Sequence, residues 1–176
     1  MQALDLSDIR FGALQTTVFD DIRPAPLTAY ESAVARLKDA GATVELFDGP
    51  EVAEAMPFSG ILFTSEAYGM WSKDIEAAPD KMFAPIRERF QSGKDYLAWD
   101  YIATWQRLEA LRAQWAARVA GFDAVLMPSA PILPPDAQRL MSDEDYYITE
   151  NLLALRNTRV GNLMGLCAVT LPTGTP

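Results

Sequence analysis

The first fifty residues constrain the fold more than any other part of the chain, because they contain a strand, a helix and a second strand in that order. The segment at residues 9–14 is short and mostly apolar. The segment at residues 43–47 alternates in polarity and begins with two β-branched residues. Between them, residues 26–40 repeat apolar side chains at helical spacing. A helical crossover between neighbouring strands makes those strands parallel. We therefore predict an α/β fold in which helices flank a mixed sheet.

Signals for both ends of this helix are present in the sequence. Thr28, with Glu31 three residues later, predicts a capping box at the start of the helix. Gly41 adopts the left-handed conformation at low cost, and this conformation is a common way for a helix to end. The sequence therefore marks where this helix starts and where it stops.

The middle of the chain, at about residues 57–120, is predicted to be a helical insertion. A proline and a glycine separate three helical stretches, at residues 57–75, 79–91 and 94–120. The third stretch repeats large apolar side chains at steps of three and four residues. At about 1.5 Å per residue it would extend for roughly 40 Å, so we expect it to span the body of the protein.

An apolar strand is predicted at residues 124–127, and a rigid loop follows it. Residues 128–135 (PSAPILPP) contain four prolines in eight positions, which prevents regular structure and stiffens the backbone. This loop would leave the carboxyl end of a strand, where α/β sheets usually bind ligands. Residues 149–166 are then predicted to be helical, and residues 168–171 to form a last strand.

Composition excludes several classes of function. The chain has 15 basic and 24 acidic residues, and the basic ones are scattered singly, which argues against a nucleic-acid partner. No stretch has the length and apolar character of a membrane span, so we expect a soluble, cytoplasmic protein. The absence of histidine removes Ser-His-Asp and Cys-His catalysis. The single cysteine, Cys167, makes neither a disulfide nor a zinc ligand set and is predicted to be a small buried side chain.

Two segments carry a resemblance to a known family. Residues 121–131 (GFDAVLMPSAP) have an Asp that begins a strand ending in Pro-Ser. Residues 157–174 (NTRVGNLMGLCAVTLPTG) have Thr and Asn four apart on a helix, followed by a strand ending in Pro-x-Gly. This pattern resembles the C-terminal half of the amidase signature enzymes. The resemblance extends over almost the whole chain and implies a partial amidase signature fold that is truncated at both ends.

The resemblance also implies the chemistry of the complete enzyme, which is hydrolysis of a carbon–nitrogen amide bond, or amide transfer in the aminoacyl-tRNA-modifying branch, without a metal or an organic cofactor. The family uses a serine nucleophile, a bridging serine and a lysine base, with the serines in a Gly-Ser-Ser stretch. This chain has no Gly-Ser-Ser, and its four lysines lie on predicted polar helix faces or turns: Lys38, Lys73, Lys81 and Lys94. No catalytic residue is therefore predicted in this chain, and the isolated chain is expected to be inactive.

Four residues are predicted to lie nearest the substrate of the complete enzyme: Ser129, Pro131, Thr158 and Asn162. In the functional interpretation, the proline loop and the Thr/Asn face of the helix line the substrate pocket. In the alternative interpretation, Thr158 and Asn162 satisfy backbone groups of the loop, and the prolines only give the loop its shape. The sequence leaves both interpretations open.

An acidic cluster of Asp143, Glu144 and Asp145 raises the question of a metal site, since carboxylates are ligands for hard cations. The spacing of a calcium loop, with its glycine, is missing. Acids at the start of a helix also complement the helix dipole without any ion. We therefore predict no metal and assign these acids to a helix start.

The expected partners are the remainder of an amidase chain and, in the complete enzyme, a small amide substrate. The chain ends just past the predicted last strand, so an unfinished sheet edge is expected to cause self-association into a homo-oligomer. The competing hypothesis is a non-catalytic module that kept the same fold and binds a small amide-like ligand or a partner chain. The sequence offers little to separate the two, although the abrupt end favours the fragment.

Overall fold

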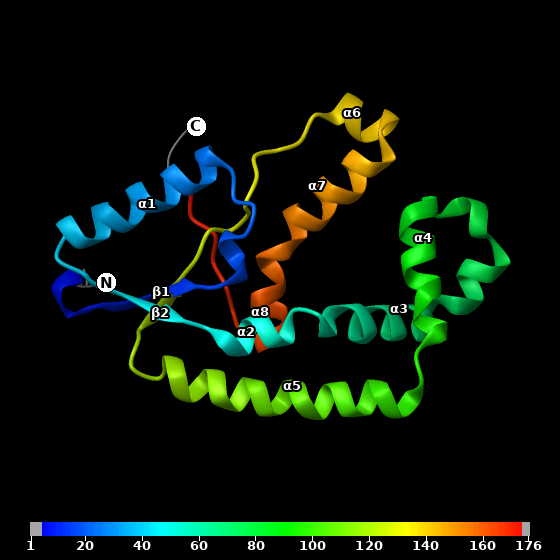
Figure 1. Ribbon diagram of the computed structural model, residues 1–176, viewed down its shortest axis with the longest axis horizontal. Helices are drawn as coiled ribbons and strands as arrows, with labels where there is room; N and C mark the ends of the chain where they lie inside the picture. The colour runs from blue at the N-terminus through cyan, green and yellow to red at the C-terminus, as the bar shows by residue number, and fades with distance from the viewer. Residues whose placement is uncertain (1–4, 174–176) are drawn as a thin grey trace.

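The computed structural model describes residues 5–173 and contains a three-stranded sheet with helices on both of its faces (Figure 1). The strands are β1 (Arg10–Gln15), β2 (Thr43–Asp48) and β3 (Ala124–Leu126). Their order in the sheet is β2-β1-β3, and both strand pairs are parallel. The predicted α/β fold class is confirmed.

Helix α1 (Pro24–Asp39) connects β1 to β2 and begins earlier than the capping signal indicated. Arg23 occupies the N-cap position without a side-chain hydrogen bond, and Pro24 follows in the first turn. The fixed φ of proline suits a helix start, and its missing N–H costs nothing there. Thr28 and Glu31 therefore lie inside the helix, and the predicted capping box is wrong.

The end of α1 is as predicted. Gly41 has a φ of 100°. Its N–H donates to the carbonyl of Lys38 at 2.9 Å, and the N–H of Ala42 donates to the carbonyl of Leu37 at 3.0 Å. These two bonds form a Schellman motif, which satisfies carbonyls at the end of the helix and turns the chain into β2.

Helix α5 (Ala98–Val119) runs along the side of the sheet opposite α1 (Figure 1). Its 22 residues extend for about 33 Å, so it spans much of the protein as predicted. It begins later than predicted because Ser92–Asp95 forms a separate 3-10 turn, η4. Trp115 of α5 is buried, with its ring centroid 5.8 Å from that of Phe47 on β2. This contact holds α5 against the sheet.

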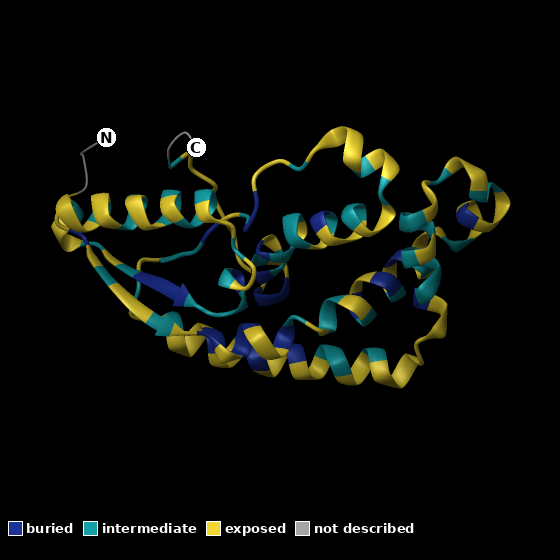
Figure 2. Ribbon diagram, turned by 45° about the horizontal axis from the view of Figure 1, so that its top comes forward, coloured by how far each residue is buried: buried dark blue, intermediate teal, exposed yellow. Residues whose placement is uncertain are grey.

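Apolar side chains from the sheet and four helices form one core. Its buried members are Leu14, Val18, Val52, Ala55, Leu62, Leu108, Leu111, Trp115, Val160, Leu163 and Met164. Figure 2 shows the buried residues gathered between the sheet and α5. Removing this apolar surface from water is the main favourable term in folding, so this layer anchors the loops that leave the sheet.

A helical part follows β2 and extends away from the sheet (Figure 1). It contains α2 (Pro50–Ala55), α3 (Phe58–Ala77), η3 (Pro79–Lys81) and α4 (Ala84–Gln91). The helix near residues 57–75 was predicted from the sequence, whereas the predicted helix at 79–91 is divided into η3 and α4. Helix α2 was not predicted, because six residues are too few for helical periodicity to be visible. Within residues 5–173, no helix combines the length and the apolar character that crossing a bilayer requires.

The C-terminal part has three helices where one was predicted. They are α6 (Ala137–Ser142), α7 (Glu144–Arg156) and α8 (Thr158–Met164). The predicted helix at residues 149–166 is therefore wrong in its bounds, because it is divided at Asn157 and starts earlier. The early start has a local cause: the carboxylate of Asp143 accepts a hydrogen bond from the backbone N–H of Tyr146 and so caps α7.

The predicted last strand at residues 168–171 is wrong. This segment is irregular and exposed, and Cys167, which was predicted to be buried, is also exposed. The segment at residues 168–171 lies beside the proline loop, since the hydroxyl of Ser129 is 3.2 Å from that of Thr170. Prolines have no N–H to donate, so such a neighbour is a poor partner for a strand ladder. The glycine of the predicted Pro-x-Gly end, Gly174, lies outside the described residues.

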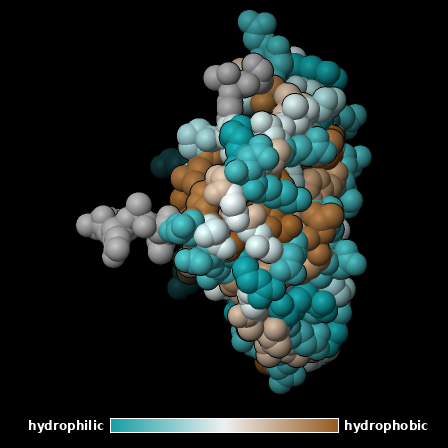
Figure 3. Space-filling model, turned by 90° about the vertical axis from the view of Figure 1, so that its left-hand side faces the viewer, coloured by the Kyte–Doolittle hydropathy of each residue, from teal (hydrophilic) through white to brown (hydrophobic). Residues whose placement is uncertain are grey.

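Large apolar side chains reach the surface at several places. Figure 3, which views the end of the molecule that carries α1, shows apolar side chains among hydrophilic ones. The most exposed large apolar side chains include Met141 of α6 at 86%, Val169 at 84%, and Leu46 of β2 at 69%. Exposed apolar groups of this size favour contact with another protein surface.

Candidate functional site

The candidate site lies at the carboxyl end of the parallel strands, where α/β sheets usually bind ligands. The segment after β1 includes Val18, and the segment after β3 is the proline loop that starts at Pro128. The junction of α7 and α8, at Asn157, lies against both segments. Three parts of the chain that are far apart in sequence therefore meet at this edge.

Asn157 joins these three segments, and its side chain is fully buried. Its amide nitrogen donates to the carbonyl of Val18 at 3.0 Å and to the carbonyl of Pro128 at 2.8 Å. Its amide oxygen accepts a hydrogen bond from Nε of Arg156 at 3.1 Å. Both amide protons and the oxygen are used, so this buried polar group is satisfied and the two loops are held in place.

The proline loop has a buried side and an exposed side. Pro131 is buried, and its carbonyl accepts a hydrogen bond from the backbone N–H of Arg23 at 2.9 Å. Ser129 is exposed, and its hydroxyl has Thr170 as its only hydrogen-bond partner among the described residues. Pro131 therefore anchors the loop, and Ser129 presents a polar group at the edge of the sheet.

Thr158 and Asn162 lie one turn apart on α8, and both are exposed. The hydroxyl of Thr158 donates to the carbonyl of Leu155 at 3.0 Å, within its own helical segment. For Asn162, the bond that the structure shows is at the backbone, where its carbonyl accepts from Nη2 of Arg112 at 3.4 Å. The interpretation in which these two residues satisfy the backbone of the loop is wrong, because Asn157 does so. No hydrogen bond among residues 5–173 joins them to Ser129 or Pro131.

Asn157 was missed in the sequence, although a signal for it exists. Leu153, Asn157, Val160 and Met164 are spaced by four, three and four residues, which places them on one helix face. A single amide on an otherwise apolar face must find partners in the core or remain unsatisfied. The sequence could therefore have marked Asn157 as a buried connecting residue, but not which segments it connects.

Charged groups surround this junction. Nη2 of Arg156 donates to the carbonyl of Val18 at 3.1 Å, and burial lowers the pKa of Arg156 although Asp20 and Asp21 act in the opposite direction. Glu150 of α7 is 2% exposed and pairs with Arg23, and its Oε2 has no hydrogen-bond partner among the described residues. The site edge therefore carries a buried carboxylate with an exposed arginine partner, and a half-buried arginine.

The four lysines of the chain do not lie in the interior. A lysine acts as a base when burial or a neighbouring cation favours its neutral form. All four are exposed: Lys38, Lys73, Lys81 and Lys94. Their amino groups are therefore in contact with solvent.

The acidic cluster at residues 143–145 lies at the start of α7, as predicted. Asp143 accepts a hydrogen bond from the backbone N–H of Tyr146 at 3.0 Å and one from Nε of Arg139 at 3.1 Å. Both hydrogen bonds lower the pKa of Asp143, and the one from Tyr146 has the larger effect. Across residues 5–173, no group of three or more metal-ligating side chains comes together.

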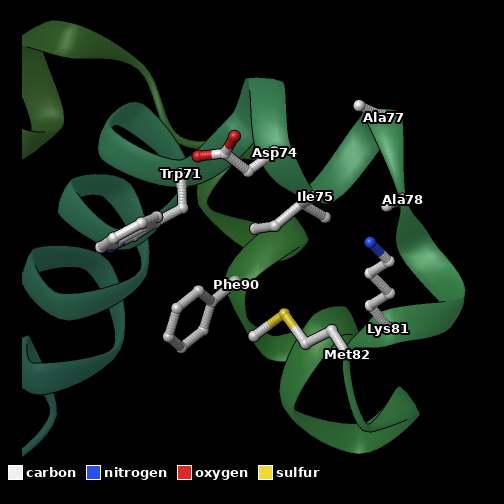
Figure 4. A pocket seen from close by; sticks show the side chains of 8 residues that line it. All are labelled: Trp71, Asp74, Ile75, Ala77, Ala78, Lys81, Met82 and Phe90. Atoms are coloured by element: carbon white, nitrogen blue, oxygen red, sulfur yellow. The ribbon is translucent and has the colours of Figure 1, made fainter.

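A hollow of about 440 Å³ lies among α3, η3 and α4 (Figure 4). It is lined by Trp71, Asp74, Ile75, Ala77, Ala78, Lys81, Met82 and Phe90. None of the four predicted substrate-contacting residues lines this hollow. The structure therefore separates it from the edge where Asn157 and the proline loop meet.

Comparison with known proteins identifies the family. A family model described as Amidase matches residues 2–176. The 2-amino-5-chloromuconic acid deaminase of Comamonas testosteroni is 30% identical over 168 residues, and an amidase of Pseudomonas putida is 26% identical over 171 residues. Each alignment covers 94% of this chain and 36% of the relative, so the chain spans about a third of the length of these relatives.

Solved structures agree on the fold. The allophanate hydrolase of Kluyveromyces lactis matches with a TM-score of 0.76 at 15% identity, over 90% of this chain and 25% of that one. The urea amidolyase of the same organism matches with a TM-score of 0.72 at 14% identity, over 86% of this chain and 9% of that one. At these identities the likeness shows the fold alone, which is the predicted amidase signature fold. Together with the family match over residues 2–176, it shows that the chain belongs to the amidase family.

Proposed function

We propose that this chain is the C-terminal, pocket-forming portion of an amidase, an enzyme that hydrolyses carbon–nitrogen amide bonds. The observation that carries this proposal is the buried side chain of Asn157, which holds the loops after β1 and β3 together at the ligand-binding edge of the sheet. A pocket wall needs this kind of preorganisation, because loops that move between conformations position a substrate poorly. In this proposal the chain shapes the pocket, and the catalytic serines and lysine come from the rest of the enzyme.

The absence of a Gly-Ser-Ser stretch from the sequence supports the proposal that the isolated chain is inactive. The family mechanism needs a serine that loses its proton to a neutral lysine through a second serine. All four lysines are exposed and are therefore poor candidates for that base. The chain would contribute shape and specificity to the reaction rather than its proton transfers.

The residues proposed to approach the substrate remain Ser129, Pro131, Thr158 and Asn162. Support is strongest for Ser129, because it is exposed at the strand end and its hydroxyl can exchange its partner Thr170 for a substrate atom at little cost. Pro131 would act by fixing the loop, since its side chain is buried. Thr158 and Asn162 are exposed on α8 and would contact a substrate or the remainder of the enzyme.

The proposed partner is the remainder of an amidase chain. The relatives are almost three times as long as the aligned region, which leaves room for a complementary catalytic part. Exposed apolar side chains such as Trp99, Ile102 and Phe63 would be covered by that part.

A chimera tests this proposal. In it, the chain replaces the aligned 36% of the Comamonas testosteroni deaminase, and ammonia release is measured from 2-amino-5-chloromuconic acid and from benzamide. We expect release from the folded chimera and none from the chain alone. A chimera with its Gly-Ser-Ser serines changed to alanine is the matched control for background. Amide hydrolysis by the purified chain alone, or a folded chimera without activity, would contradict the proposal.

A further inference from the structure

Three arginines gather where α4, α7 and α8 meet. Helix α4 lies against α7, because the rings of Phe83 and Tyr147 are in edge contact with centroids 5.3 Å apart. Further along, Nη1 of Arg89 on α4 donates to the side-chain oxygen of Asn151 on α7 at 3.2 Å. Arg159 follows Asn151 by eight residues and lies on α8, where burial and the positive charge of Arg89 lower the pKa of Arg159. In Figure 1, α7 lies between the sheet and α4.

Two of these arginines have partners, and the third has none. Arg89 is held by Asn151, and Arg156 is held by the carbonyl of Val18 and the amide oxygen of Asn157. Arg159 is half-buried, and its guanidinium makes no ion pair and no hydrogen bond among the described residues. Burial, and then the positive charges of Arg89 and Arg156, lower the pKa of Arg159. This guanidinium is only partly solvated and has no counter-ion among the described residues, so a bound anion would stabilise it.

The nearby carboxylates do not neutralise Arg159. Glu150 is buried and pairs with Arg23. Asp20 and Asp21 act on Arg156. The whole chain has a net charge of −9, so this local excess of positive charge runs against its overall balance. Such a local field attracts small anions.

An apolar strip leads to Arg159. Ile148, Leu152 and Leu155 of α7 and then Arg159 are spaced by four, three and four residues, which places them on one side of the helical segment. The three apolar residues are 39%, 42% and 44% exposed. A small molecule lying along this strip would place its hydrocarbon part on apolar side chains and its end at a guanidinium.

We propose that Arg159, flanked by Arg89 and Arg156, binds a carboxylate of the substrate, so that the substrate class is a small amide or related C–N compound with a free carboxylate. The planar guanidinium offers two parallel N–H donors that match the two oxygens of a carboxylate. The strip of Ile148, Leu152 and Leu155 contacts the carbon chain between the carboxylate and the reacting bond. This inference rests on the proposed function for the reaction, but the binding step itself needs only this chain.

Binding of a probe carboxylate to the purified chain tests the inference. Succinate is titrated at low ionic strength and followed by the NMR signals of the arginine side chains, with uncharged succinamide as the matched compound. We expect saturable binding of succinate and none of succinamide. Arg159→Met should weaken succinate binding at least about tenfold, since one charge-assisted bidentate contact is lost. Arg159→Lys should retain part of the binding, because the charge remains.

Arg107→Met is the matched control, because Arg107 lies on α5 and pairs with Glu54 at 2.6 Å, away from the cluster. It should bind succinate as the unchanged chain does, and circular dichroism should show that all variants are folded. Equal succinate binding by Arg159→Met, equal binding of succinamide, or no saturable binding would overturn the inference. Because no catalysis is measured, these outcomes are independent of whether the chimera hydrolyses amides.

Discussion

The side-chain nitrogen of Asn157 lies 2.8 Å from the carbonyl oxygen of Pro128, which ties the start of α8 to the loop that leaves β3. The same nitrogen reaches Val18 after β1, so one buried amide fixes the relative position of two strand ends. Neither loop forms the backbone hydrogen bonds of a β-sheet at this point. The shape of the ligand-binding edge therefore depends on this side chain.

Replacing Asn157 with alanine should lower the free energy of unfolding by about 2–4 kcal/mol, because the carbonyl of Pro128 loses its donor, the carbonyl of Val18 loses one of its two donors, and a small cavity forms. Urea denaturation followed by circular dichroism measures this change. Asn162→Ala is the matched control, since Asn162 is exposed and the hydrogen bond shown for it is at its backbone. That variant should stay within about 0.5 kcal/mol of the unchanged chain. Equal effects of the two substitutions would show that Asn157 does not hold the loops.

The sequence predicts well those elements whose cause is local. Strands β1 and β2 and the end of α1 at Gly41 follow from patterns of a few residues, and the structure confirms them. The start of α1 is also local, but two signals compete there, and Pro24 prevails over Thr28.

Elements that depend on a neighbour were not predictable. Residues 168–171 have the composition of a strand, yet the neighbour that the structure shows is the proline loop, which offers few donors. Which segments Asn157 connects, and which side chains lie near Arg159, become visible only once α4, α7 and the loops are placed together. The sequence pattern alone directed attention to Thr158 and Asn162, the exposed residues of the same helix.

Gly93→Ala should destabilise the protein by about 1–3 kcal/mol, because the new Cβ must push α3 and η4 apart. At this position a Cβ would lie 1.9 Å from the carbonyl oxygen of Thr64, and backbone has little freedom to move. Gly69→Ala, on α3, provides the matched control, since no atom lies within 4 Å of its added Cβ. It should raise stability by about 0.5–1 kcal/mol, as a glycine in a helix is replaced by a better helix former. Thermal melts of both variants check this prediction, since the melting temperature should fall for Gly93→Ala and rise for Gly69→Ala.

The isolated chain should self-associate through β2, since the last strand from which this was expected does not form. β2 is an edge strand of the described sheet, and Leu46 on it is 69% exposed. An edge strand with exposed apolar groups is prone to pair with another chain. Light scattering should show a mass that grows with concentration, and Leu46→Lys should reduce it. Met141→Lys, at an even more exposed position on α6, should leave the association unchanged, and a monodisperse chain at every concentration would refute this prediction.

Glu51→Gln should remove part of the acid sensitivity of the fold. Glu51 of α2 is 4% exposed and accepts hydrogen bonds from Arg118 of α5, with Nη2 to Oε1 at 2.8 Å and Nε to Oε2 at 2.9 Å. These bonds lower the pKa of Glu51 below its ordinary value of 4.5, although burial acts in the opposite direction. A carboxylate whose pKa is lower in the folded state stabilises the protein above its unfolded pKa. That stabilisation is lost as the pH falls through the pKa of the folded state.

The unchanged chain should therefore be more stable than Glu51→Gln at neutral pH, and the difference should shrink once the pH falls below about 4.5. Urea denaturation at a series of pH values measures this difference directly. Glu54→Gln is the matched control: Glu54 also pairs with an arginine, but both side chains are about half exposed, so solvent screens the pair and the difference should be smaller. A gap between the unchanged chain and Glu51→Gln that stays constant from neutral to acid pH would show that packing of Glu51, and not its charge, connects α2 to α5.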